Sequence, residues 1–269
     1  MTSPDVLVRV ATARGVTTLT LDSPHNRNAL SSSLMTQLLA GLADAVADEA
    51  VRVIVLDHTG PVFCSGADLK ETAAAYASGT VPAAVLGDVL AALWECPKPV
   101  LARVAGPARA GGLGLIAAAD LAVCAEEATF AFTEVRIGVI PAVISATVLP
   151  RLHPRAAAEL YLTGDTFDGR RAAEIGLVTA AVPADELDAA VSRYCDSLVR
   201  GAPGALAGAK ELLRRPGTAE LRGELARLSA LSIGFFLSDE GREGVAAFRD
   251  KRLTRWVAAL DGGHSDHAG

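Results

Sequence analysis

Two glycine-containing segments of the chain are each predicted to leave backbone N–H groups exposed. The first, residues 63–71 (FCSGADLKE), directly follows an apolar run that is predicted to be a buried strand. Its small residues, with Gly66 at the centre, let the backbone turn with its N–H groups exposed. An ordinary strand-to-helix turn capped by Asp68 is the alternative interpretation of this segment taken alone.

The second segment, residues 97–106 (PKPVLARVAG), is followed by a glycine pair, Gly111 and Gly112. The pair opens a predicted helix, and the free N–H groups and dipole of a helix N-terminus favour negative charge. The glycines do not fit the G-x-G-x-x-G fingerprint, and the chain contains no Walker A sequence. A cradle for nucleotide phosphates is therefore not indicated.

Other reactive side chains lack the arrangement that their chemistry needs. Ser65 beside Gly66 does not form a nucleophile elbow, and no histidine is placed as its base, which argues against a serine hydrolase. We expect no metal site at His58, His153, His264 or His267.

The elements that must position these segments are predicted from the apolar periodicity. Residues 6–10 and Val16–Leu21 are rich in Val, Leu and Thr, and the Gly-containing turn between them indicates a hairpin. Ser31 or Ser32 caps a predicted helix with an apolar stripe. Residues 51–57 follow as a buried strand, so strand, helix and strand predict a right-handed crossover unit.

The same pattern recurs along the chain. Further strands are predicted at Val100–Val104, Leu121–Ala125 and 176–182, and further helices at 111–119, 156–162 and 170–175. Helices at 185–200, 205–214, 218–232 and 239–256 then lead almost to the end. The polar, Gly-rich residues 261–269 are predicted to be disordered. The fold class is α/β with a helical C-terminal part, which by itself gives no function.

Composition excludes several classes of protein. The chain has 269 residues, of which 51% are hydrophobic, so it can bury a sizeable core. A net charge of -6 argues against a nucleic-acid or membrane surface as partner. We see no signal peptide and no apolar run of membrane-span length. The four cysteines are scattered, which favours reduced thiols in a cytoplasmic protein.

Five segments, in this order and spacing, resemble the crotonase (enoyl-CoA hydratase/isomerase) family along nearly the whole chain. They are residues 21–30, including LDSP and NAL, residues 63–71, residues 97–112, residues 133–141 (TEVRIGVIP) and residues 240–252. The resemblance implies a crotonase-like ββα spiral core with a CoA groove over 1–195, a helical C-terminal oligomerisation part over 196–260 and a disordered tail over 261–269. It also implies a homotrimer or a dimer of trimers.

The same resemblance implies residue roles. The backbone N–H groups of Ala67 and Gly111 match the family's oxyanion-hole donors, which stabilise the enolate of a CoA thioester. Glu134 matches an acid/base glutamate, and the N–H of Ala142 matches a water-positioning group in a place where the family usually has Gly. The residues matched to CoA binding are Arg27, Asn28, Ala29, Ala67, Asp68, Leu69, Phe248 and Lys251, the last two at the adenosine end of a CoA bound mainly by a neighbouring subunit. No cofactor is expected, because CoA is part of the substrate.

One position departs from the family's pattern. Hydratases of fatty-acid oxidation carry a first glutamate where this chain has Gly114, and Asp120 nearby is read as structural. Glu71 and Tyr76 are candidates to replace the missing carboxylate. Gly114 is also expected to leave room for a bulkier or branched acyl chain. The surrounding sequence looks like the branch that contains methylglutaconyl-CoA and isohexenylglutaconyl-CoA hydratases.

The sequence therefore predicts a lyase that adds water to a 2-enoyl-CoA, of branched or glutaconyl type. Two alternatives remain open at this point. One is another crotonase reaction through the same enolate, namely isomerisation, decarboxylation or thioester hydrolysis. The other is a CoA-binding paralogue without chemistry, which Gly114 favours and Glu134 disfavours.

Overall fold

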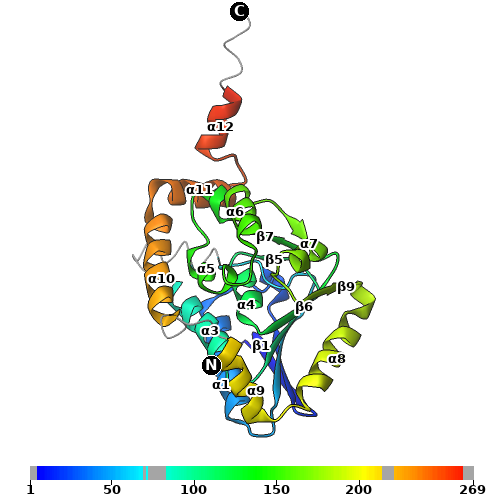
Figure 1. The fold of residues 1–269 in the computed structure, drawn as a ribbon. Helices are drawn as coiled ribbons and strands as arrows, with labels where there is room; N and C mark the ends of the chain where they lie inside the picture. The colour runs from blue at the N-terminus through cyan, green and yellow to red at the C-terminus, as the bar shows by residue number, and fades with distance from the viewer. Residues whose placement is uncertain (1–4, 69–70, 72–82, 214–220, 263–269) are drawn as a thin grey trace, which may run out of the picture.

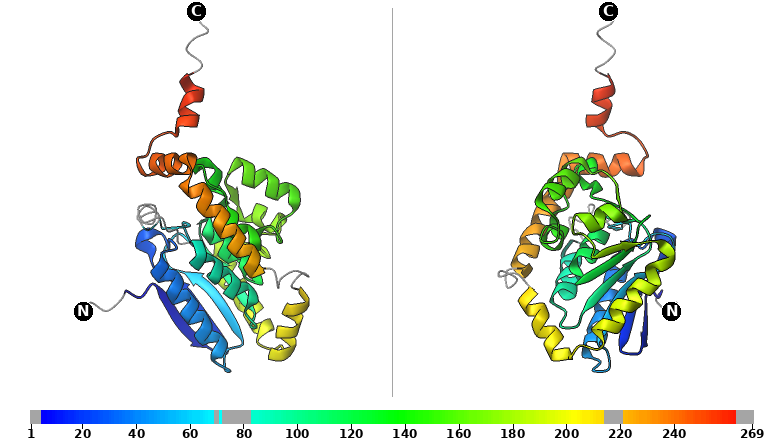
Figure 2. Two further views of the ribbon diagram at one scale, coloured as in Figure 1. Left: turned by 90° about the vertical axis from the view of Figure 1, so that its left-hand side faces the viewer. Right: turned by 45° about the vertical axis from the view of Figure 1, so that its right-hand side comes forward.

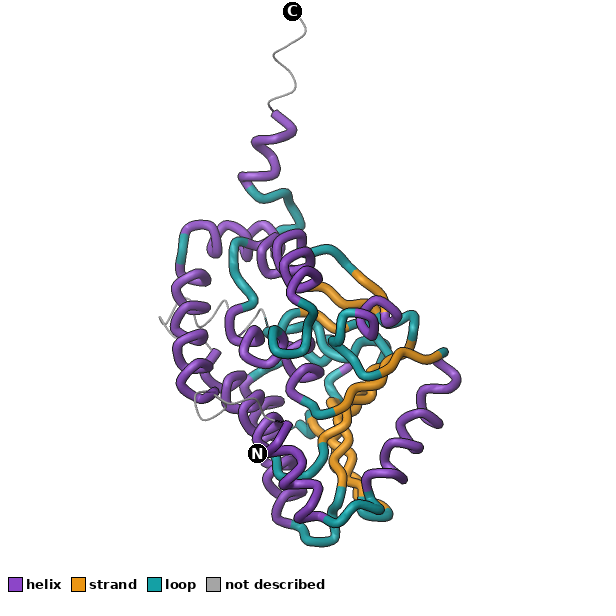
Figure 3. Tube along the Cα trace, viewed as in Figure 1, coloured by secondary structure: helices purple, strands orange, loops and turns teal. Residues whose placement is uncertain are grey.

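The computed structural model describes residues 5–68, 71, 83–213 and 221–262. Two site candidates, Leu69 and Tyr76, lie outside the described residues, as do residues 263–269 of the predicted tail. In the described part, a twisted sheet lies between helices on both of its faces, and further helices extend the molecule toward the C-terminus (Figure 1, Figure 3). This α/β architecture with a helical C-terminal region agrees with the predicted fold class.

The main sheet of the described residues has the strand order β1-β2-β3-β4-β6-β9. The bounds are β1 Val8–Ala13, β2 Val16–Leu21, β3 Val53–His58, β4 Val100–Val104, β6 Leu121–Ala125 and β9 Ala180–Val182. Strands β1 and β2 pair antiparallel, which confirms the predicted hairpin, and the later neighbours are parallel. The apolar runs of β3, β4 and β6 follow from this position, because parallel strands are covered on both faces.

Helix α1 (Ser32–Ala47) connects β2 to β3 and confirms the predicted crossover helix. Its N-terminus is fixed by Ser31, whose Oγ accepts a hydrogen bond from the N–H of Leu34 at 3.2 Å. The stripe that begins with Leu34 and Leu38 is buried, and the helix packs on β1 and β2. Helix α8 (Leu187–Leu198) packs on β4 and β6 from the other side of the sheet (Figure 1).

The remaining helices and short turns surround this core. They are η1 Pro24–Asn26, α3 Ala83–Glu95, α4 Gly111–Ala118, η2 Thr133–Ile137, α5 Ala142–Val148, α6 Pro154–Thr163, α7 Gly169–Glu174, η3 Ala184–Glu186, α9 Pro203–Leu213, α10 Leu221–Leu237, α11 Asp239–Arg249 and α12 Arg255–Gly262. The sequence did not predict α3 or α5. Helix α5 is short, and no side chain caps its N-terminus, so it carries no start signal.

A second, small sheet was also not predicted, and it organises the functional segments. It consists of β5 (Ala108–Arg109), β7 (Thr129–Ala131) and β8 (Phe167–Asp168), which are too short to show a period of two. Strand β5 leads directly into α4, and β7 leads into η2. An isolated bridge joins Cys64 to Ala108, so the two glycine-containing segments meet at this sheet.

The predicted helix at 239–256 is two helices, α11 and α12. The break lies at Lys251, which has a left-handed backbone (φ 53°), and the N–H of Arg252 turns back to the carbonyl of Ala247 at 3.0 Å. The carboxylate of Glu243 accepts hydrogen bonds from the guanidinium of Arg252 (2.7 and 3.0 Å) and from the backbone N–H of Arg255 (2.9 Å). Helix α12 consequently projects away from the body of the molecule (Figure 2).

A buried ion pair attaches α9 to the sheet, and we predict that it is important for stability. Lys210 is buried, contacts the carboxylate of Asp120, and donates to the carbonyl of Lys98 at 2.8 Å. Lys210→Ala would remove the cation from Asp120, which is partly exposed and keeps its hydrogen bond from the N–H of Val100, so the free energy of unfolding should fall by about 1–3 kcal/mol. Urea denaturation measures this loss. Exposed Glu211 on the same helix provides the control, since Glu211→Ala should change stability little. Equal stabilities of both variants would contradict the prediction.

Candidate active site

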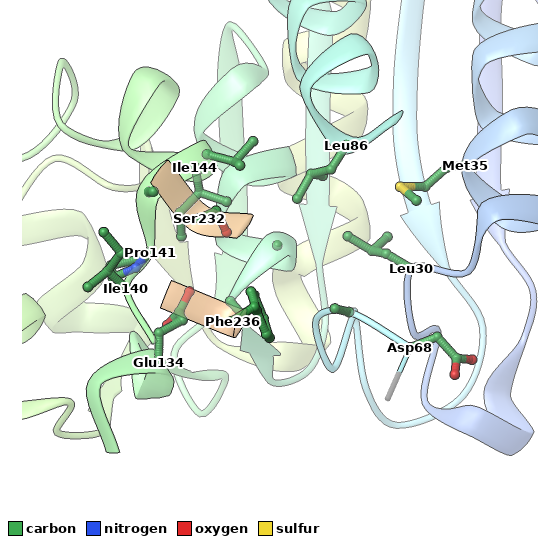
Figure 4. A pocket seen from close by; sticks show the side chains of 15 residues that line it. Leu30, Met35, Asp68, Leu86, Glu134, Ile140, Pro141, Ile144, Ser232 and Phe236 are labelled. Atoms are coloured by element: carbon green, nitrogen blue, oxygen red, sulfur yellow. The ribbon is translucent and has the colours of Figure 1, made fainter. Parts of the chain in front are cut away.

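Five of the predicted residues line a single pocket: Ala67, Asp68, Gly111, Glu134 and Ala142. The pocket encloses about 700 Å³ of space, part of it open to solvent. Its other lining is mainly apolar and includes Leu30, Met35, Leu86, Ile140, Ile144 and Phe236. Figure 4 shows Glu134 on one side of the pocket and Leu30 and Asp68 on the other. The carboxyl group of Glu134 therefore lies across the pocket from a wall of mainly apolar side chains that also includes Asp68.

The segment around Ala67 pairs with Leu30 in a short parallel bridge, and the N–H group of Ala67 points away from that bridge. The N–H of Leu30 donates to the carbonyl of Gly66 at 2.8 Å, and the N–H of Asp68 donates to the carbonyl of Leu30 at 3.4 Å. Because successive residues of an extended chain point their N–H groups to opposite sides, the N–H of Ala67 points away from Leu30. No acceptor for it is found within the described residues.

Gly111 is the first residue of α4, so its N–H group has no partner inside the helix. The preceding residue, Ala110, is a non-glycine residue with φ 48° and ψ −119°. Such a backbone conformation costs on the order of 1–3 kcal/mol and is maintained only by the surrounding structure. Ala67 and Gly111 thus both line the pocket, and the backbone N–H of each has no acceptor among the described residues. The oxyanion-hole role that the resemblance implies for them stays a prediction.

Glu134 lies in the short 3-10 turn η2 and is buried. Its Oε2 atom has no hydrogen-bond partner within the described part of the chain. Burial raises the pKa of this carboxyl to about 7, and a hydrogen bond from its own backbone N–H opposes the increase only in part. A carboxyl group with a pKa near neutrality is suited both to take up and to return a proton.

The expected space at Gly114 does not exist, because Ile144 fills it. A Cβ atom on Gly114 would lie 2.6 Å from Cγ2 and 3.1 Å from Cβ of Ile144, which is a pocket residue on α5. The expectation that Gly114 leaves room for a bulkier acyl chain is therefore wrong. The place of the missing glutamate is occupied by an apolar side chain that cannot move aside by a simple rotation of its far end.

Glu71 does not replace the missing carboxylate in this structure. Its Oε2 atom accepts hydrogen bonds from the backbone N–H (2.9 Å) and the hydroxyl (2.7 Å) of Ser32, at the start of α1. Glu71 is not among the residues that line the pocket. Its carboxylate instead satisfies the N-terminus of α1.

The role expected for Ala142 is not supported by the geometry. Its N–H group donates to the carbonyl of Ile140 at 2.8 Å across Pro141. An N–H group engaged in this way is not free to hold a water molecule. Ala142 nevertheless lines the pocket, where it begins α5.

Of the residues matched to CoA binding in the segment 27–29, two are buried and one is exposed to a ligand. The side chain of Asn28 is fully buried and engaged: its Oδ1 accepts from the N–H of Ser23 at 2.8 Å, and its Nδ2 donates to the carbonyls of Thr59 (3.0 Å) and Val62 (2.8 Å). The CoA role expected for this side chain is therefore not supported. Ala29 is buried as well, whereas the guanidinium of Arg27 is on an exposed residue that remains available to a phosphate.

The remaining matched residues lie at the edges of the site. Asp68 borders the pocket and also accepts a hydrogen bond from the N–H of Glu71 at 3.3 Å, as a helix cap would. Phe248 and Lys251 are exposed at the end of α11 and do not line the pocket. They are available only to a ligand or partner that approaches from outside the chain.

Sequence reasoning missed the contribution of α10 to the pocket. Ser232 and Phe236 of this helix line the pocket, and Phe236 projects into it in Figure 4. Their spacing of four residues places both on one helix face. This was a usable signal, but the predicted helix ended at residue 232 and left Phe236 outside.

No other class of site is evident. Among the described residues, no three His, Cys, Asp or Glu side chains come together in a way that would hold a metal ion. None of the helices in the described part of the chain combines the length and hydropathy of a transmembrane helix.

Comparisons with known proteins show the family of the chain. A family model described as enoyl-CoA hydratase/isomerase matches residues 11–259. The 2,3-dehydroadipyl-CoA hydratase of Escherichia coli K12 is 31% identical over 248 residues, covering 90% of this chain and 95% of that protein. A crystal structure of an enoyl-CoA hydratase from Mycobacterium avium has a TM-score of 0.85 and 46% identity, covering 94% of this chain and 99% of that chain. A structure of methylmalonyl-CoA decarboxylase in complex with 2-nitronate-propionyl-CoA has a TM-score of 0.82 and 26% identity, with 93% and 98% coverage.

The close contact between Gly114 and Ile144 predicts a coupled pair. Gly114→Ala should lower the free energy of unfolding by about 1–3 kcal/mol, because the new methyl group overlaps Ile144. Ile144→Ala alone should cost about 2–5 kcal/mol by creating a cavity. In the double variant the methyl group enters that cavity, so its loss should be smaller than the sum of the two single losses by about 1 kcal/mol or more. Urea denaturation of the four proteins measures this coupling, and additive losses would contradict it.

Proposed function

Because the chain belongs to the enoyl-CoA hydratase/isomerase family, we propose that it adds water across the double bond of a 2-enoyl-CoA thioester, with Glu134 as its single acid/base group. The observation that carries the proposal is the buried carboxyl of Glu134, with a pKa of about 7, in a pocket that Ala67 and Gly111 also line. Membership of this family indicates that the chain is an enzyme of the enoyl-CoA hydratase type.

The thioester carbonyl binds between the N–H groups of Ala67 and Gly111. When a nucleophile adds to the β-carbon, the electrons of the double bond move toward the carbonyl, and the thioester oxygen becomes an enolate oxygen. Two preorganised donors stabilise that charge, and loss of one such donor typically costs about 2.7–4 kcal/mol in the transition state. The N–H groups of Ala67 and Gly111 suit this task because neither has an acceptor within the described residues.

Glu134 handles the proton in both half-reactions. As a carboxylate it takes one proton from water while the water oxygen bonds to the β-carbon. As a neutral acid it then returns that proton to the α-carbon, and the enolate collapses to the 3-hydroxyacyl thioester. Addition on one face of the double bond lets a single carboxyl perform both transfers, so the scheme requires no carboxylate at Gly114.

We propose an apolar acyl chain, linear or branched, rather than a glutaconyl-type chain. The described pocket lining contains Glu134 and Asp68 but no Lys, Arg or His to neutralise a second carboxylate on the substrate. The expected glutaconyl substrate is therefore less well supported than a branched apolar one. A comparison of kcat/KM for a branched apolar 2-enoyl-CoA and a glutaconyl-type CoA ester tests this proposal, and a preference for the second would overturn it.

A decarboxylase is the second candidate, favoured by the likeness to methylmalonyl-CoA decarboxylase, which is described with a bound propionyl-CoA analogue. A substrate panel separates the candidates when thioester absorbance and CO₂ release are both followed. Release of CO₂ from a malonyl-type thioester, without hydration of any enoyl-CoA, would replace the proposal. Turnover of neither class would favour the non-catalytic reading.

Activity should require ionised Glu134, which gives a pH-dependent prediction. Since the carboxylate is the reactive form before attack and its pKa lies at about 7, kcat/KM should fall tenfold per pH unit below that value. Glu134→Gln should lower kcat by about 10²–10⁴-fold with little change in the affinity for acyl-CoA. Exposed Glu127 supplies the matched control, because Glu127→Gln should leave kcat unchanged. Near-normal turnover by Glu134→Gln would refute the assigned role.

We further propose a homotrimer, or a dimer of trimers, assembled through the C-terminal helices. Apolar side chains are exposed on and beside α10, α11 and α12, at Leu231, Phe235, Phe248, Leu253 and Val257. Such a surface is typical of an interface between subunits. In this assembly, Phe248 and Lys251 would contact the adenosine end of a CoA bound mainly by the neighbouring subunit.

Sedimentation tests the assembly. The protein should sediment as a trimer or hexamer at micromolar concentration, and Phe248→Ala should raise the KM for acyl-CoA more than it lowers kcat, because the side chain is placed far from the reacting carbon. A stable, active monomer would contradict the proposal.

A further inference from the structure

Helix α11 lies directly against the turn that carries Glu134. Gly244 of α11 faces the carbonyl oxygen of Ile137, the last residue of η2, so closely that a Cβ atom would overlap it. Gly138, which ends η2 with φ 71°, faces the carbonyl oxygen of Glu240, and a Cβ there would lie 2.5 Å from that oxygen. The two backbones therefore meet without side chains between them at both ends of the contact.

The turn is also held by contacts with the end of α6. The guanidinium of Arg136, also in η2, donates to Asp165 at 2.6 Å and to the carbonyl of Thr163 at 3.2 Å. These contacts lie at the end of α6 and just beyond it. The η2 turn thus contacts both the end of α6 and the backbone of α11. A displacement of α11 has to displace the turn or open the contact.

The side chain of Glu134 adds little of its own to this fixation. Its Oε2 atom has no hydrogen-bond partner among the described residues, so the backbone of η2 determines where the carboxyl group stands. Within the turn, the N–H of Val139 donates to the carbonyl of Glu134 at 3.1 Å. The position of the carboxyl therefore depends on the position of the turn.

We propose that α11 positions Glu134, and that Gly244 is the residue through which it does so. The inference rests on the proposed role of Glu134 in proton transfer. Gly244 is not among the residues that line the pocket, so it acts as a positioning residue. Because Gly244 has no side chain, the backbone of α11 can pack directly on the carbonyl of Ile137 at the end of η2. This contact fixes the turn, and the turn fixes the carboxyl group of Glu134 in the pocket.

Helix α10 provides a second route from α11 to the pocket. The two helices are joined at Ser238, whose Oγ accepts from the N–H of Gly241 at 3.0 Å and caps α11. Gly241 packs closely on the carbonyl of Phe235, and the next residue, Phe236, lines the pocket. Helix α10 consequently lines the pocket, and α11 contacts both α10 and the turn that carries Glu134.

The test is Gly244→Ala, assayed on an enoyl-CoA that the parent hydrates. The methyl group forces α11 and η2 apart, so kcat should fall at least about tenfold, whereas KM should stay within about twofold, since small misplacements of a catalytic group chiefly affect the chemical step. Gly234→Ala on α10 is the matched control, because nothing lies within 4 Å of its new Cβ. This control should keep the parent's kcat and KM.

A second variant keeps the proposal testable if Gly244→Ala does not fold. Ser238→Ala removes the cap of α11 without adding an atom, so it should lower kcat several-fold at constant KM. A folded Gly244→Ala protein with the parent's kcat would overturn the inference, and so would a rise in KM alone. If only Ser238→Ala folds, an unchanged kcat overturns it. Retained turnover in Glu134→Gln would instead refute the proposed function, so the two failures are distinguishable.

Discussion

The site depends on the burial of one carboxyl group, one oxygen of which has no hydrogen-bond partner among the described residues. An unsatisfied buried polar atom costs about 1–3 kcal/mol, so Glu134 stays in place only because other contacts hold its turn. Those contacts are made by backbone: Gly138 against Glu240 and Gly244 against Ile137. The same burial raises the pKa of Glu134 to about 7. The burial of Glu134 thus lowers the stability of the folded protein at the residue that is proposed to exchange a proton.

A second unfavourable feature lies across the same pocket. Ala110 holds a left-handed backbone immediately before Gly111, at the entry to α4. The surrounding structure offsets this strain, since β5 and the bridge from Cys64 to Ala108 fix the chain on one side and the buried α4 fixes it on the other. Both the donor and the acid/base group are therefore maintained by packing that extends well beyond the pocket.

The sequence predicted the features that depend on neighbouring residues in the chain. The hairpin, the Ser31 cap and the two glycine-containing segments all follow from local spacing. The features that were missed depend on contacts between distant segments. Nothing near Gly114 indicates that Ile144 fills the space beside it, and nothing near Asn28 indicates that its amide binds the carbonyls of Thr59 and Val62. The share of α10 in the pocket was missed because the boundary predicted for that helix fell before Phe236.

The contact between Gly114 and Ile144 also bears on how this lineage could change its chemistry. A carboxylate at residue 114 has no space while Ile144 is present, and a smaller residue at 144 that arises first leaves an empty volume in a close-packed interior. Each single replacement is selected against before the pair can act together. The single replacements that lie between the one-carboxylate and the two-carboxylate form of this pocket are therefore less stable than either form. Natural sequences should carry either glycine at 114 with a large residue at 144 or a carboxylate at 114 with a smaller residue at 144, and few should carry a mixture.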